Sequence, residues 1–128
     1  MWGATKHMTP YRLGYWLKII VADIVPVEGH LFVNYQGLSC EELERKVSTY
    51  ASPREAQLWM NIVLLNDFIS ETCGDDWEDA EAREILEVVA KAWEYQVQAK
   101  YPKATFRIED VSDPEFGDLG LRLIGDLG

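Results

Sequence analysis

The sequence predicts an α+β domain in which a four-stranded antiparallel sheet carries three helices on one face, in the order ββαααββ. Two segments rich in β-branched and aromatic residues lie near the ends of the chain, at 15–36 and 104–124. Between them, three segments each carry the signals of a helix start. The chain has 128 residues, which suits one domain, and we expect that domain to span residues 8–128.

The first hairpin is predicted within the stretch YWLKIIVADIVPVEGHLFVNYQG, as strands at about 15–25 and 30–36 around a Pro-Val-Glu-Gly break. A helix is the alternative for the first of these segments. Thr9 and Pro10 suit a helix start, and several apolar residues follow at helical spacing: Leu13, Trp16, Leu17, Ile20 and Ile24. The β-branched run at 19–21, together with the extended conformation favoured before proline, favours the strand.

The first two predicted helices begin at clear caps. Ser39, with Glu42 three residues later, forms a capping box for a short helix. Ser52 and Pro53 begin a second helix that we expect to continue to Gly74, where a left-handed residue would end it. This second helix is apolar around most of its circumference, so we expect it to form the centre of the core.

The third helix and the second hairpin complete the predicted fold. The helix is expected from about residue 76 to residue 100, where Tyr101-Pro102 stops it. Two alternating segments then follow, at 104–111 and 119–124, separated by a turn-rich loop. We predict that they pair as antiparallel strands.

Charge and composition limit the classes of partner. The chain has 22 acidic and 12 basic residues, a net charge of −10, and no basic stripe, which disfavours binding to nucleic acid or to an anionic membrane. A basic protein would be attracted. With no signal peptide, no apolar run long enough to span a bilayer and only Cys40 and Cys73 as thiols, we expect a cytoplasmic protein with reduced cysteines.

The N-terminal residues are treated separately. The segment MWGATKH at 1–7 is typical of a cloning junction, and we expect the native chain to begin at Met8. His30 is then the only native histidine.

Catalytic signals are weak, and an enzyme is the less favoured class. Cys40 and His30 form the one thiol–imidazole pair available, with Cys40 at a predicted helix N-terminus. Glu41 and Glu42 follow Cys40 directly and oppose thiolate formation. The glycine-rich phosphate-binding motifs and the serine hydrolase elbow are also missing, so no cofactor is predicted.

A metal site is likewise not predicted. The only candidate oxygen ligands that cluster are Asp75, Asp76, Glu78 and Asp79. Calcium needs about six to eight oxygens, usually from a loop that adds backbone carbonyls, and this segment offers too little loop.

The stretch ETCGDDWEDAEARE at 71–84 is the strongest functional signal, with seven acidic residues and one basic residue. Favourable interaction with the helix dipole accounts for the acids nearest the helix start, but not for Glu71, Glu81 or Glu84. We therefore predict a small acidic interaction protein (an inhibitor, an immunity-type antidote or a regulator) that binds a basic protein, with Trp77 as an apolar anchor. The predicted contact residues are Glu71, Asp75, Asp76, Trp77, Glu78, Asp79, Glu81 and Glu84.

Two alternatives remain open. The first is a small-molecule-binding domain or minor enzyme whose pocket lies between sheet and helices, lined by Trp16, Tyr35, Trp59 and Trp93. The second is a homodimer joined along an exposed sheet edge.

Overall fold

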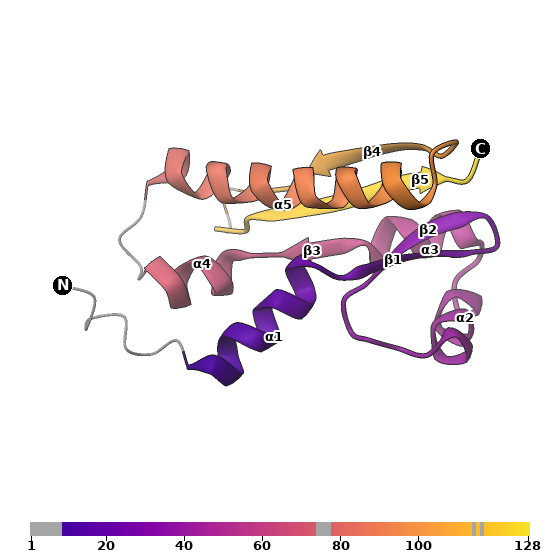
Figure 1. Ribbon diagram of the computed structural model, residues 1–128, viewed down its shortest axis with the longest axis horizontal. Helices are drawn as coiled ribbons and strands as arrows, with labels where there is room; N and C mark the ends of the chain where they lie inside the picture. The colour runs from indigo at the N-terminus through magenta and orange to yellow at the C-terminus, as the bar shows by residue number, and fades with distance from the viewer. Residues whose placement is uncertain (1–8, 74–77, 114, 116) are drawn as a thin grey trace.

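The computed structural model describes residues 9–73, 78–113, 115 and 117–128; the predicted cloning-derived segment 1–7 lies outside these ranges. In the described part, five helices and five strands follow one another in the order α1–β1–β2–α2–α3–β3–α4–α5–β4–β5 (Figure 1). The predicted α+β class and the antiparallel pairing are confirmed. The predicted order ββαααββ is wrong, because it lacks one strand and two helices.

The chain begins with a helix, α1 (Pro10–Ile20), where the sequence predicted a strand. The Thr9 hydroxyl accepts a hydrogen bond from a backbone N–H of the first turn, and proline occupies the first helical position. Trp16 and Ile19 lie buried on one side of the helix. The β-branched residues that favoured a strand lie at the end of the helix, where they cost little, and the alternative based on helical spacing was the right one as far as residue 20.

The first hairpin is confirmed, with its first strand later in the chain than predicted. Strands β1 (Asp23–Val27) and β2 (His30–Asn34) pair antiparallel through a two-residue turn. Both turn residues, Glu28 and Gly29, have positive φ angles, of 49° and 81°. Two successive positive φ values make a turn whose twist matches that of the two strands.

Two caps recognised in the sequence start helices as predicted. In α2 (Cys40–Ser48), the Ser39 hydroxyl and the Glu42 side chain exchange hydrogen bonds with each other's backbone N–H. In α3 (Pro53–Met60), the Ser52 hydroxyl caps the first turn.

The predicted helix from Ser52 to Gly74 is interrupted. After α3, the chain forms a short strand, β3 (Ile62–Leu64), and then a new helix, α4 (Asn66–Cys73). The strand pairs antiparallel with β5 (Gly120–Asp126). A short run that is apolar on all sides suits a buried strand as well as a buried helix, and only the pairing with β5 decides between them.

The third predicted helix and the second hairpin are present. Helix α5 (Asp79–Lys100) is the longest in the described chain, and β4 (Thr105–Asp110) pairs with β5 over the full length of β4. The sheet therefore has five strands instead of four.

Strand β5 is the centre of the sheet. It has β4 on one edge, and it has both β2 and β3 on the other, β3 beside its beginning and β2 beside its end. Hydrogen bonds from Leu65 N–H to Leu119 O and from Leu127 N–H to Gly29 O mark this shared edge. The backbones of β2 and β5 pair directly at one position, His30 opposite Asp126, and no further pairing between them is recorded along the described β2.

Two side-chain amides from α3 and its C-terminal cap fill that gap. Gln57 and Asn61 are only 1% and 0% exposed. Gln57 donates to Leu31 O on β2 at 2.8 Å and to Gly125 O on β5 at 2.6 Å. Asn61 likewise bonds to both strands, so these amides take the place of the backbone ladder.

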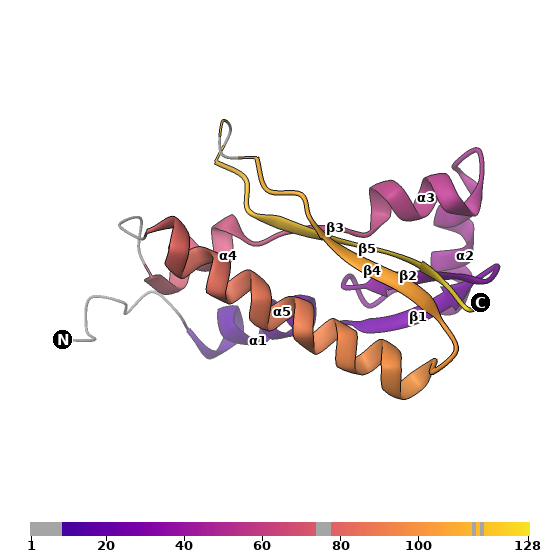
Figure 2. The ribbon, with the colours of Figure 1, turned by 90° about the horizontal axis from the view of Figure 1, so that it is seen from above.

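Helices cover both faces of the β1–β2 hairpin, whereas the sequence predicted helices on one face. Figure 2 shows α5 on one side of the sheet and α3 on the other. The larger core joins α1, α4 and α5 to one face of the sheet, with Trp93 at its centre. The smaller core lies on the opposite face of the hairpin, and its buried members are Val27, Phe32, Leu43, Val47 and Ala56. Residues alternate along a strand, so each strand of the hairpin supplies both cores.

Candidate functional site

Helix α5 is the longest helix in the described chain, and its side away from the sheet is exposed. The inward side of this helix is buried against the sheet through residues spaced three and four apart: Ala82, Leu86, Val89, Trp93 and Val97. The opposite side carries Glu84, Val88, Lys91 and Tyr95 in one stripe at the same spacing. Val88 and Tyr95 are each 67% exposed, although both are large and apolar in part.

Acidic side chains surround this stripe. Glu81, Glu84, Glu87 and Glu94 are exposed on α5, and in the described part of the chain none of them forms an ion pair. The neighbouring Arg83 instead pairs with Asp110 at the end of β4. We call the set Glu81, Glu84, Glu87, Val88, Glu94 and Tyr95 the α5 outer face. Lys91, which is exposed on the same side of the helix, offsets one of these four negative charges, so the face stays acidic.

The structure divides the acidic stretch predicted from the sequence. Glu78, Glu81 and Glu84 lie at the start of α5, where Glu81 Oε1 accepts from the Glu78 backbone N–H at 3.2 Å. Asp79 is the first residue of α5. Asp75, Asp76 and Trp77 lie outside the described residues.

Glu71 is held inside the chain, on α4. Its carboxylate forms an ion pair with Arg12 and accepts from the indole N–H of Trp16, with a Trp16 Nε1 to Glu71 Oε2 distance of 2.7 Å. These bonds, the indole first and then the guanidinium, lower the pKa of the Glu71 carboxyl. The helix dipole does not account for the negative charge of Glu71, but the structure does: the Glu71 carboxylate joins α4 to α1.

The four residues of the predicted aromatic pocket do not converge on one cavity. Trp16 and Trp93 are buried in the larger core, where Trp93 Nε1 donates to Ile20 O. Tyr35 and Trp59 do line a common cleft, of about 170 Å³, between β2, α2 and α3. Trp59 is 61% exposed, so that cleft is shallow on its side.

The thiol–imidazole pair is also not assembled. Cys40 is exposed at the first position of α2, and His30 begins β2, where its Nδ1 lies 3.2 Å from Glu28 O. The structure records no hydrogen bond between the two side chains within the described chain.

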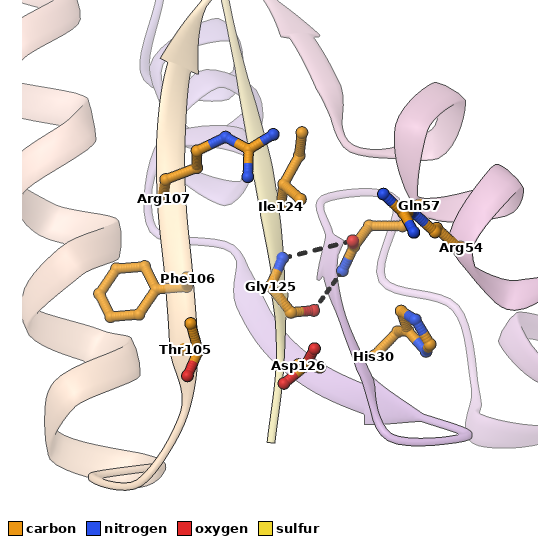
Figure 3. Close-up of a pocket in the computed structure, with 9 residues that line it drawn as sticks. All are labelled: His30, Arg54, Gln57, Thr105, Phe106, Arg107, Ile124, Gly125 and Asp126. Carbon is orange, nitrogen blue, oxygen red and sulfur yellow. Dashed lines mark hydrogen bonds between the residues drawn. The ribbon is translucent and has the colours of Figure 1, made fainter. Parts of the chain in front are cut away.

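A groove of about 440 Å³ lies between α3 and the end of the β4–β5 hairpin. Figure 3 shows Arg54 from α3 and Arg107 from β4 extending toward each other over Ile124, with His30 and Asp126 at one end. Arg107 Nε donates to Glu109 at 3.0 Å, whereas Arg54 has no ion pair in the described part of the chain. Two of the residues that line this groove are arginines and one, Asp126, is acidic.

Sequence reasoning identified Glu81 and Glu84 of the α5 outer face, and it missed the apolar residues of that face and the whole groove. Val88 and Tyr95 lie opposite the inward positions of the third helix, and a helical wheel drawn around those positions would have shown it. The groove had no such signal, because Arg54 and Arg107 are far apart in the chain and line the same groove only through the pairing of β4 with β5 and the packing of α3.

The remaining structural and comparative findings assign no chemistry. Among the described residues, no three His, Cys, Asp or Glu side chains are placed to hold a metal ion. No helix in the described chain is long and apolar enough to cross a membrane. Comparison of the chain with protein-family models, curated proteins and solved structures finds no match to any of them.

Proposed function

We propose that the protein is a small acidic interaction protein that binds a basic protein surface through the α5 outer face and the acidic start of α5. The observation that carries the proposal is the set of exposed, unpaired glutamates around two exposed apolar side chains. Interface hot spots are commonly aromatic residues surrounded by polar ones, which is the pattern around Tyr95.

The two kinds of residue would act at different stages of binding. Glu84, Glu87 and Glu94 attract a basic partner over a range of about 8 Å at physiological salt and orient it before contact. Val88 and Tyr95 lie about two helical turns apart and lose exposed apolar surface only in the complex. Inhibitors, immunity-type antidotes and regulators that occupy a basic site work in this way, and they need no catalytic group of their own.

The test identifies a partner and then maps where it binds. Proteins recovered from the source lysate at low and at high salt are compared, and a basic protein recovered only at low salt is purified for affinity measurements. We expect Tyr95→Ala, and separately the pair Glu84→Lys with Glu87→Lys, each to weaken its binding about tenfold or more.

Matched controls use exposed residues away from α5. Tyr11→Ala changes an exposed tyrosine of α1, and Glu44→Lys reverses an exposed charge of α2. Both should bind like the unmodified chain. Equal affinity of the α5 variants and the unmodified chain would exclude this surface as the binding site.

A second candidate function rests on the groove beside α3. Arg54 and Arg107 face each other there, and two guanidinium groups so placed suit a small ligand that carries a carboxylate or phosphate group. Titration with inorganic phosphate should cause saturable changes in the NMR chemical shifts of residues around Arg54. Arg54→Gln should abolish these changes, whereas Arg45→Gln, on α2, should leave them as they are. The absence of saturable shifts in the unmodified chain would exclude an anion site in this groove.

A further inference from the structure

The outer edge of β4 presents unpaired backbone groups, and the hydrogen bonds of β5 show which they are. The Gln57 side chain bonds both the N–H and the C=O of Gly125, from the side of β2. Those two groups therefore point away from β4. Gly125 lies opposite Phe106, so Phe106 is not hydrogen-bonded to β5, and its N–H and C=O point outward.

The backbone N–H and C=O groups point outward at every second residue of β4. Leu123 lies opposite Ile108, and its C=O accepts from Asn61 on the side of β2. Ile108 and then Asp110 consequently direct their N–H and C=O groups to the outer edge as well. No hydrogen bond in the described chain uses these groups. In Figures 1 and 2 no other element lies along this edge of β4.

The outer edge of β1, on the opposite side of the sheet, is covered by side chains of α5 and of the residue that follows it. At β1, Gln96 of α5 accepts from Ile24 N–H at 2.7 Å and donates to Ala22 O at 2.9 Å. The Tyr101 hydroxyl donates to Ile24 O at 3.1 Å. Proteins commonly cover exposed sheet edges in such ways, because a free edge can pair with another chain. This protein covers the edge of β1 and leaves that of β4 open.

We propose that the open edge pairs with the same edge of a second copy of this chain, β4 antiparallel to β4, with Ile108 opposite Ile108. The outward groups of Phe106, Ile108 and Asp110 then form about six hydrogen bonds between the two copies. Arg107 of each copy lies opposite Glu109 of the other, as a non-hydrogen-bonded pair with the side chains close together.

Charge selects this register. A shift of two residues in one direction places Arg107 opposite Arg107, and a shift in the other direction places Glu109 opposite Glu109. Like charges directly opposite each other are destabilising, so only the proposed register is self-complementary. The net charge of −10 on each copy opposes association, and we expect a weak dimer that forms in the micromolar range or above.

The test uses two charge reversals. Each should weaken the dimer when its variant is measured alone, and mixing the two variants should restore association. Arg107→Glu creates two Glu–Glu pairs in its own dimer, and Glu109→Arg creates two Arg–Arg pairs. In an equal mixture of the two variants, every cross-strand pair is again of opposite charge. Sedimentation equilibrium should show each variant associating about tenfold or more weakly than the unmodified chain, with association restored in the mixture.

A second measurement needs no variant, which matters because Glu109 also binds Arg107 and Arg122 within one copy, at 3.0 Å and 2.9 Å. Amide hydrogen exchange is followed at low and high protein concentration. The amides of Phe106, Ile108 and Asp110 should exchange more slowly at high concentration, whereas those of Arg107 and Glu109, already bonded to β5, should not change. The proposal would be overturned if the unmodified chain stays monomeric or if either variant dimerises as well as the unmodified chain. It would also be overturned if the mixture does not associate, or if the protection does not alternate between these residues.

Discussion

Replacing Asn61 with leucine is expected to remove the amide that joins β2 to β5 while keeping a side chain of similar size. The Asn61 side chain is fully buried and accepts from Val33 N–H at 3.0 Å. Its amide nitrogen donates to Leu31 O at 2.8 Å and to Leu123 O at 3.0 Å. Leucine can form none of these bonds.

The expected cost follows from the groups that lose their partners. Leu31 O keeps a second donor, Gln57 Nε2, at 2.8 Å. Val33 N–H and Leu123 O have no other partner in the described chain, and each buried unpaired group costs about 1–3 kcal/mol. Asn61→Leu should therefore lower the free energy of unfolding by about 2–6 kcal/mol, a large part of the roughly 5–15 kcal/mol typical of a domain.

Urea unfolding followed by circular dichroism measures this loss, as a lower midpoint with an unchanged slope. Asn66→Leu is the matched control, since Asn66 Oδ1 is buried without a hydrogen-bond partner. The same substitution there removes no bond from that atom and should cost much less. A loss below about 1 kcal/mol at Asn61, or equal losses at the two positions, would refute the role assigned to the buried amide.

Three further substitutions give simpler tests. Gly125→Ala places a Cβ 2.5 Å from Phe106 Cβ on the neighbouring strand, and should lower the free energy of unfolding by about 1–3 kcal/mol. In Gly14→Ala, in α1, the added Cβ meets no atom within 4 Å, so this variant should raise the free energy of unfolding by about 0.5–1 kcal/mol. Melting temperatures in the opposite order, with Gly125→Ala more stable than Gly14→Ala, would contradict both expectations. The pKa of Glu71 is lower in the folded state, so its contribution to stability is full above about pH 4.3 and is lost as the pH falls through the folded value. Glu71→Gln should make the urea midpoint less dependent on pH between about 6 and 3, and an unchanged pH dependence would contradict the Trp16 contact.

Local signals in the sequence were sufficient for much of the fold. The capping box at Ser39 and the Ser52-Pro53 start act within a few residues, and the structure bears out both. The second hairpin also follows from alternation along the chain. Each of these depends on interactions between residues close in sequence, which a single sequence records directly.

The candidate surfaces were less accessible to this reasoning. The negative charge around 71–84 was evident from the sequence. The sequence did not show which of these acids are paired within the chain and which are not. Glu71 is bound by Arg12 and Trp16, more than fifty positions earlier in the chain. The acids on α5 lack such partners, and the apolar residues exposed among them were not singled out.

By itself, then, the sequence determined the α+β class, the capped helix starts at Ser39 and Ser52, both hairpins and the acidic character of the protein, because propensity, capping and charge are local properties. Only the tertiary structure decided that the run at 62–64 is a strand, that residues 10–20 form a helix, and that one sheet edge stays open. The physical reason is that a short apolar segment is stable either as a helix or as a strand. The choice depends on which distant backbone it can pair with: here β5, whose other partners are held in place by two buried amides.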